Sequence, residues 1–233
     1  MGYKLTWVYI GQTKVRPSGW GWWQPWANTL AYYPLTSTTT VNDMSGNNKN
    51  MTNNWSVTFG NVLWVDCATF SWSNYLNKGE SLFTWSATFT VNLWYKKTWN
   101  YDNHTNLFTI GTSNGKNNFL IWGYPSWDKI NHLMLWWWDN DRDTLYIVPS
   151  NTWINIIVTH SWWAVNVYIN GNLQYTWTVD YNIQSWYTWV WCSPTNSTPM
   201  IWNMSNLIIE SSQRTSQEAS DYYNLTKWNY WIS

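Results

Sequence analysis

Trp153-Ile154-Asn155-Ile156-Ile157-Val158-Thr159-His160, followed after four residues by Val165-Asn166-Val167-Tyr168-Ile169-Asn170-Gly171, decides the fold of this chain of 233 residues. Both runs are rich in the β-branched residues that favour strands. The second run alternates polar and apolar positions with the two-residue period of a strand. Asn170-Gly171 is a strong signal for a two-residue hairpin turn, because both central positions of such a turn need a positive φ. The stretch therefore predicts consecutive antiparallel strands.

The same signals recur along most of the chain. Brief runs of strand-forming residues, separated by turn residues at intervals of about 8–12 residues, are typical of an all-β sandwich. The predicted strands comprise residues 29–35, 56–59, 67–70, 87–95, 106–110, 118–121, 132–135, 144–148, 153–159, 165–169, 173–179 and 200–209. One short helix is predicted near the C-terminus, because Thr215-Ser216-Gln217-Glu218 forms a capping box at its start.

Composition limits the classes of partner. The net charge is zero and only 10% of the residues are charged. Without a basic patch the chain has no electrostatic footprint for a phosphate backbone, so we expect no nucleic-acid partner. No window of about 18 apolar residues occurs, so we expect no membrane insertion. The first ten residues lack the apolar segment of a secretory signal peptide.

The chain is expected to divide into a short leader and one domain. Residues 1–27 contain two possible short strands, at 5–10 and 14–17, followed by a segment of Gly, Trp and Pro, and this region is interpreted as a leader or linker. The globular pattern begins at residue 28 and continues to residue 233. All-β sandwiches of this length commonly form a single domain.

The segments together resemble a known superfamily. Leu30-Ala31-Tyr32-Tyr33-Pro34-Leu35, the turn segment Val41–Asn47 and the Trp-opened strand with its Tyr-x-Asn-Gly hairpin are similar to laminin-G-like, concanavalin A-like jelly-roll domains. Residues 201–209 are similar to the closing strand of that superfamily, and 215–223 to the helix that often follows. The resemblance covers about residues 28–227 and implies a two-sheet antiparallel jelly-roll sandwich with one short C-terminal helix.

The resemblance also implies a function. Domains of this kind in bacterial or phage surface proteins are recognition or adhesion modules, which suggests an extracellular, cell-surface or virion location. We expect a non-catalytic module that binds a glycan or a protein surface as part of a larger protein. The alternative is a purely structural spacer domain of a surface or phage tail protein, without a small ligand.

Glycoside hydrolysis is the enzymatic activity that this superfamily would suggest. Retaining enzymes need two carboxyl groups about 5–5.5 Å apart, and the glucanases of the superfamily place them on one strand as Glu-x-Asp-x-x-Glu. The chain has three glutamates, Glu80, Glu210 and Glu218, and none has an Asp two residues further on. The sequence therefore argues against an enzyme.

A calcium site is the one cofactor that the sequence suggests. Asp139, Asp141 and Asp143 place carboxylates at alternate positions, as at the start of a calcium-binding loop. No glycine follows at the sixth position, and position twelve is Ser150 instead of glutamate. A solvated turn is therefore the favoured interpretation, with no cofactor, and calcium remains an alternative that the superfamily resemblance supports.

Tryptophan is unusually frequent and glycine unusually rare, with 26 Trp and 11 Gly in the chain. Trp162 and Trp163 separate two strand patterns, where a tight loop favours glycine. Trp72 and Trp202 stand where the superfamily tends to have glycine. We hypothesise that many tryptophans are glycines encoded by UGA, a codon that some bacterial lineages and phages read as glycine. The alternative is a truly tryptophan-rich surface, and the coding DNA distinguishes the two.

Other aromatic residues and the cysteines complete the candidates. Trp94 and Trp153 stand at strand positions where a large apolar side chain would fill a core. Sugar binding would need an aromatic platform, for which the candidates are Tyr32, Tyr101, Tyr124 and Tyr187. Cys67 and Cys192 either form a disulfide or remain two separate buried thiols.

Overall fold

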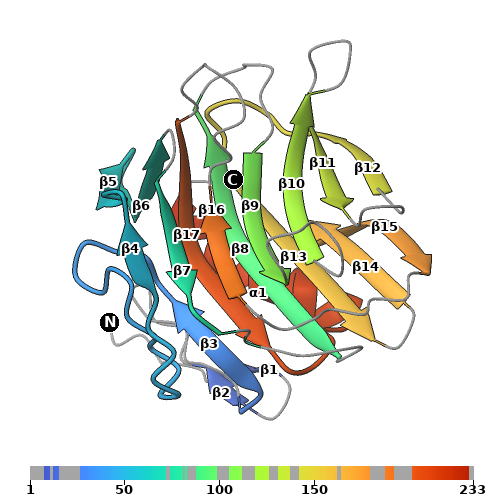
Figure 1. The fold of residues 1–233 in the computed structure, drawn as a ribbon. Helices are drawn as coiled ribbons and strands as arrows, with labels where there is room; N and C mark the ends of the chain where they lie inside the picture. Colours follow the sequence, from blue (N-terminus) through green and yellow to red (C-terminus); the bar gives the residue numbers. More distant parts are fainter. Residues whose placement is uncertain are drawn as a thin grey trace, which may run out of the picture.

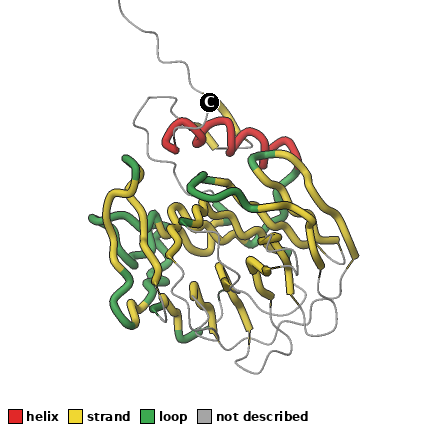
Figure 2. The backbone as a smooth tube through the Cα atoms, turned by 90° about the horizontal axis from the view of Figure 1, so that it is seen from above, coloured by secondary structure: helices red, strands yellow, loops and turns green. Residues whose placement is uncertain are grey.

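A computed structural model describes residues 8–10, 13–15, 27–71, 74–80, 82, 88–98, 105–111, 119–125, 131–136, 142–161, 164–178, 187–191 and 201–230. Among these residues, two antiparallel β-sheets stack face to face, and one α-helix lies on the outside of one of them (Figures 1 and 2). The all-β sandwich with one short helix, predicted from the sequence, is confirmed.

The larger sheet has eight strands. Its order is β15 (Asn172–Thr178), β14 (Ala164–Ile169), β13 (Ile154–Ser161), β8 (Phe89–Lys97), β17 (Ile201–Glu210), β6 (Val65–Ser71) and β5 (Thr58–Val62), and β3 (Thr29–Tyr33) pairs with the remaining part of β17. The hairpin predicted at Asn170-Gly171 joins β14 to β15, with Ile169 opposite Asn172. Residues 153–171 thus form the two neighbouring strands β13 and β14 and the turn that leads into β15, at one side of this sheet.

The smaller sheet has seven strands. Its order is β12 (Arg142–Ile147), β11 (Asn131–Trp136), β10 (Phe119–Pro125), β9 (Thr105–Gly111), β16 (Tyr187–Trp191), β7 (Tyr75–Lys78) and β4 (Thr52–Asn54). A separate hairpin, β1 (Val8–Ile10) with β2 (Thr13–Val15), precedes both sheets. Two strands are therefore present in the predicted leader, and the boundary at residue 28 stays a prediction.

The main core lies between the two sheets. Phe89, Val91, Leu93 and Tyr95 of β8 point into it at alternate positions, as the period of a strand requires. Trp202 lies there too, fully buried and stacked on Phe70 with ring centroids 4.0 Å apart.

A second apolar cluster lies between the eight-stranded sheet and the helix α1 (Ser216–Thr226). Trp94 stacks on Tyr230 with ring centroids 3.8 Å apart, and Tyr222 of the helix is buried in the same cluster. Tyr230 ends the 3-10 helix η1 (Lys227–Tyr230) that continues α1. Because β8 faces the main core on one side and α1 on the other, it is buried along its whole length.

The predicted strands all overlap observed strands, but three observed strands were not predicted. These are β4, β7 and β16, which lie next to one another in the seven-stranded sheet. The helix begins at Ser216 with Thr215 as its N-cap, and both hydrogen bonds of the predicted capping box are present.

The structure also places residues on which the sequence left alternatives open. Trp94 and Trp153 are buried, as predicted. Trp202 was expected to stand for glycine, but its ring fills the core, so the structure gives it a packing role. Cys67 is a buried free thiol in the second cluster, and Cys192 lies outside the described residues.

Candidate functional site

The candidate site is the outer face of the seven-stranded sheet, defined here by the positions of this sheet that point away from the core. Helix α1 covers the corresponding face of the eight-stranded sheet (Figure 2). In the part of the chain that the structure describes, the outer face of the seven-stranded sheet has no such helix. We therefore take this second face as the candidate binding surface.

Strand β7 shows how the outer face is built. Leu76 is fully buried in the core, whereas Tyr75 and Asn77, one residue before and after it, are half-buried. Side chains alternate between the two faces of a strand, so Tyr75 and Asn77 belong to the outer face. The alternation gives one aromatic and one amide side chain next to each other.

The strand register extends this face across the sheet. Tyr75 is paired with Asn54 of β4 on one side and with Trp191 of β16 on the other. Residues directly opposite each other in an antiparallel pair lie on the same face. A first row on the outer face therefore contains an amide position and two aromatic positions.

A second row runs parallel to the first. Asn77 is paired with Thr52 and with Trp189, and Trp189 is paired in turn with Thr109 of β9. The two rows are connected, because the amide nitrogen of Asn54 donates a hydrogen bond of 2.9 Å to the side-chain oxygen of Asn77. This bond orients both amides at the surface.

The chemistry of these side chains suits an uncharged polar ligand. A tyrosine ring offers an apolar face and a polar hydroxyl, and a surface amide offers two donors and an acceptor. A sugar ring presents the complementary groups, namely C–H faces and hydroxyls. Tyr75 and the pair Asn54 and Asn77 can therefore stack on a sugar and hydrogen-bond to it.

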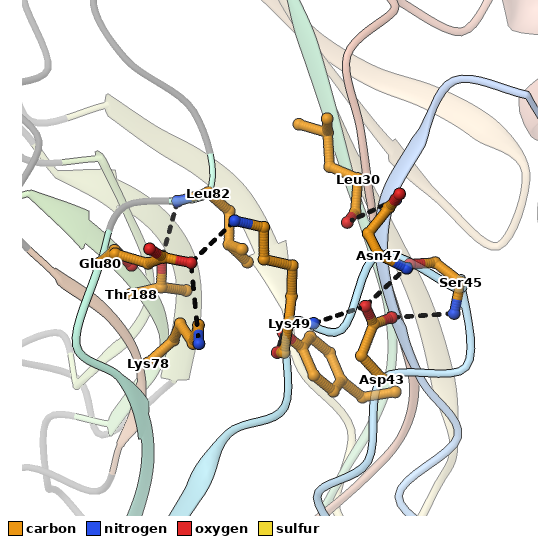
Figure 3. Close-up of polar contacts among 10 residues, drawn as sticks. Leu30, Asp43, Ser45, Asn47, Lys49, Lys78, Glu80, Leu82 and Thr188 are labelled. Atoms are coloured by element: carbon orange, nitrogen blue, oxygen red, sulfur yellow. Dashed lines mark hydrogen bonds and ion pairs between the residues drawn. The ribbon is translucent and has the colours of Figure 1, made fainter.

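The segment from residue 42 to residue 50 holds the edge of this face in place (Figure 3). It lies in the crossover from β3 in one sheet to β4 in the other. The Asp43 carboxylate accepts hydrogen bonds from the backbone N–H groups of Tyr32, Ser45 and Lys49, and from the Ser45 hydroxyl. Because its oxygens already accept four hydrogen bonds, Asp43 acts as the organising centre of the loop.

An ion pair fastens this loop to the end of β7. The Lys49 ammonium lies 2.8 Å from a Glu80 carboxylate oxygen, and Lys78 lies 3.7 Å from the same oxygen (Figure 3). The hydrogen bond from Lys49, followed by its charge, lowers the pKa of Glu80. The Thr188 hydroxyl of β16 donates to the Glu80 carbonyl and accepts from the Leu82 N–H, which joins the next strand to the same corner.

Each of the three glutamates therefore has a structural partner. Glu80 pairs with the two lysines, and Glu210 is fully buried against Arg214 with bonds of 2.7 and 2.9 Å. Glu218 caps the helix by accepting a hydrogen bond from the Thr215 N–H. Glu80 follows β7, Glu210 ends β17 and Glu218 lies in the first turn of α1, and each is held by its own structural partner.

The solvated turn favoured at residues 139–143 stays a prediction, and calcium stays its alternative. Asp139 and Asp141 lie outside the described residues. Asp143 is described, and its Oδ1 accepts a hydrogen bond of 2.7 Å from the Leu145 N–H, as in a local turn. No group of three or more metal-ligating side chains occurs among the residues that the structure covers.

The predicted aromatic candidates divide into three groups. Tyr32 is buried in the second cluster and donates a hydrogen bond to Asn206, so the prediction that it forms a sugar platform is wrong. Tyr124 and Tyr187 lie on β10 and β16, at register positions of the outer face. Tyr101 lies outside the described residues.

Sequence reasoning missed Tyr75, Asn77 and Asn54. The signal was present as the alternation Tyr75-Leu76-Asn77, with one apolar residue between two that tolerate water. The run is only four residues long and contains asparagine, which strands disfavour. Their contact across two strands depends on register, which the sequence does not state.

No protein-family model and no curated protein match the chain. Solved structures do match. Domain 4 of AbnA, a GH43 extracellular arabinanase from Geobacillus stearothermophilus in complex with arabinotriose, has a TM-score of 0.67 and 18% identity, over 83% of this chain and 97% of that domain. The binding domain of Paraclostridial Mosquitocidal Protein 1 has a TM-score of 0.68 and 16% identity, over 84% of this chain and 52% of the other.

A botulinum neurotoxin of type C, whose cell entry depends on interaction with two ganglioside molecules, also matches. Its TM-score is 0.67 at 14% identity, over 84% of this chain and 51% of the toxin chain. The chain thus spans about half the length of the toxin structures and nearly all of the arabinanase domain. At these identities the likeness shows a shared β-sandwich fold. No helix in the described part of the chain is long and apolar enough to cross a membrane.

Proposed function

We propose that this protein is a non-catalytic recognition module that binds a glycan on the outer face of the seven-stranded sheet. The observation that carries the proposal is the half-buried Tyr75 beside the linked amides of Asn54 and Asn77, on the face that α1 leaves open. An aromatic ring with convergent amides is the kind of surface that recognises a sugar by stacking and hydrogen bonding.

The comparisons support a binding role. The similar arabinanase domain was solved with arabinotriose, and the similar type C toxin interacts with gangliosides. A related toxin binding domain was solved with rat synaptotagmin II, so a protein surface is the second ligand class that this fold accommodates. The linked amides and the adjacent aromatic ring favour a glycan over a protein.

The structural roles of the glutamates support the absence of catalysis. Glu210 is sealed by Arg214, and Glu218 holds the helix N-terminus. Both carboxylates are thus engaged in contacts that stabilise the fold, which is consistent with a module that binds without catalysis.

The module belongs to a larger extracellular, cell-surface or virion protein of the laminin-G-like, concanavalin A-like kind. The segment before residue 28, with its own hairpin of β1 and β2, serves as the tether to that assembly. Its role is adhesion or docking.

A glycan array tests the proposal. The purified protein is expected to bind one family of oligosaccharides, and Asn77→Ala is expected to abolish or strongly weaken that signal. Trp228→Ala is the control, because Trp228 is exposed on the helix side of the sandwich. Absence of binding across a broad panel would favour the structural spacer instead.

A further inference from the structure

The hairpin between β5 and β6 has an unusual turn. Val62 pairs with Val65, so Leu63 and Trp64 are the two central residues of the turn. Their φ angles are 50° and 68°, both in the left-handed region. A two-residue hairpin turn with positive φ at both positions is the type I′ turn, which strongly prefers Asn-Gly.

The same chain contains a matched example of that turn. Between β14 and β15, Ile169 pairs with Asn172, and the central residues Asn170 and Gly171 have φ angles of 51° and 75°. The turns therefore have corresponding backbones, and Trp64 occupies the position that Gly171 occupies in the other. A side chain at this φ clashes with the following carbonyl, whereas glycine does not.

Trp55, in the link from β4 to β5, is a second tryptophan with a positive φ. Its φ is 62°, and φ at the following Ser56 is 65°. Two turns of the fold thus place tryptophan where the backbone favours glycine.

Neither tryptophan gains packing that would offset this strain. The Trp55 side chain is 72% exposed and that of Trp64 is 81% exposed. Burial of an indole ring is the main reason for a protein to use one. By contrast, Trp94 and Trp202 are fully buried and stack on other rings.

A positive φ and an exposed side chain do not by themselves show that a position should be glycine, because Leu63 and Leu145 combine the same two properties. Composition supplies the second, independent observation. The chain has 26 tryptophans and 11 glycines, the reverse of ordinary usage. A codon read as tryptophan in place of glycine accounts for both the composition and the backbone at these two positions.

We infer that residues 55 and 64 are glycine in the protein as its own cells make it, each encoded by a UGA codon that those cells read as glycine. The surface at this end of the sandwich then lacks two exposed indole rings. The β5–β6 turn becomes Leu-Gly, with glycine at the same position as in the Asn170-Gly171 hairpin. This inference is independent of the proposed glycan site, which rests on tyrosine and asparagine.

The coding DNA and the mass of the native protein test the inference together. We expect UGA at codons 55 and 64. Trypsin releases residues 50–78 as one peptide, because no Lys or Arg lies between Lys49 and Lys78. In protein isolated from its source, fragmentation of this peptide should show the residue mass of glycine at both positions. UGG at these codons, or tryptophan in the native peptide, overturns the inference.

A comparison of melting temperatures tests the conformational basis of the inference, in the chain that carries tryptophan at both positions. Trp64→Gly should melt at a higher temperature than Trp64→Ala, because alanine keeps the steric cost of positive φ. Trp55→Gly and Trp55→Ala should show the same order. Trp228 is the matched control, being exposed in η1 with no positive φ, so there alanine should be at least as stable as glycine. Equal or lower melting of the glycine variants at 55 and 64 contradicts the argument.

Discussion

The Glu210–Arg214 pair is the most deeply buried charged contact among the described residues. The guanidinium meets both carboxylate oxygens and also lies over the Tyr222 ring, 4.8 Å from its centre. The backbone N–H of Arg214 donates to the Thr90 hydroxyl of β8. This hydrogen bond links the segment between β17 and α1 to strand β8. The position of the pair suggests that it fixes where the helix leaves the sheet.

Removing one partner of the Glu210–Arg214 pair should strongly reduce the stability of the protein. Glu210→Ala removes the carboxylate that neutralises the buried guanidinium, and we expect it to reduce the free energy of unfolding by about 3–5 kcal/mol. Urea denaturation measures the change. Glu80→Ala is the control, because its ion pairs with Lys49 and Lys78 are solvent-exposed and should contribute far less. An equal loss in the free energy of unfolding in the two variants would show that burial does not determine how much these ion pairs contribute to stability.

The Cys67 thiol illustrates how burial controls reactivity. Burial, and next the nearby Asp66 carboxylate, raises the pKa of Cys67 to about 12. Since the thiolate is the reactive form, iodoacetamide should modify Cys67 very slowly in the folded protein at pH 8 and rapidly in urea. A Cys192→Ser background leaves Cys67 as the only thiol. Rapid labelling of the folded protein would contradict its burial.

The same pKa shift makes a contribution to stability that depends on pH. A thiol whose pKa is raised by folding contributes fully below its unfolded pKa of about 8.5, and the contribution is lost as pH rises from there towards 12. The free energy of unfolding should therefore fall above about pH 8.5. Cys67→Ala should show a weaker fall over that range, as measured by urea denaturation at successive pH values.

At the scale of single elements, α1 is held by its cap and by one apolar face. Thr215 accepts from the Glu218 N–H at 3.2 Å, and Glu218 accepts from the Thr215 N–H at 2.8 Å. Ala219 and Tyr222 pack on the second cluster. The helix is only 11 residues long, a length at which an isolated helix is marginal in water, so the cap and the packing must stabilise it.

Loss of the cap should therefore be measurable. Thr215→Ala removes the acceptor for the Glu218 N–H, and we expect a loss of about 1 kcal/mol in the free energy of unfolding. Thr215→Ser keeps a hydroxyl in place and should behave nearly as the parent protein does. Unchanged stability of the alanine variant in urea would mean that the cap is redundant with the packing.

Elements also show how far sequence reasoning reached. The β13 and β14 strands were predictable because long β-branched runs and the Asn170-Gly171 turn agree with each other. The capping box located α1 to within a residue. In contrast, β4 and β7 are three and four residues long and rich in asparagine, so their strand state comes from pairing within the sheet. Local pattern cannot reveal such strands.

The candidate site was less predictable than the fold for a related reason. Its first row joins Asn54 and Tyr75 to Trp191, which lies more than a hundred residues further along the chain. Only the three-dimensional order of β4, β7 and β16 brings these positions together. Tyr187 was selected from the sequence and is placed on this face, whereas Tyr32 was selected on the same grounds and is buried.

At the scale of the whole molecule, the two sheets have unequal outer faces. The eight-stranded sheet is covered by α1 and contributes to two apolar clusters, so it forms the structural layer (Figure 2). The seven-stranded sheet contributes to the main core on one side and presents Tyr75 with its neighbouring amides on the other. This asymmetry is the physical basis for assigning recognition to one face.

Calorimetric titration with the tightest-binding oligosaccharide from the array tests this assignment most directly. We expect Tyr75→Ala to bind at least about tenfold more weakly than the parent protein, a loss of roughly 1.4 kcal/mol, because the stacking ring is gone. Trp228→Ala, altered on the helix side, should bind as the parent does. Undiminished affinity of the Tyr75 variant would contradict the assignment of binding to this face.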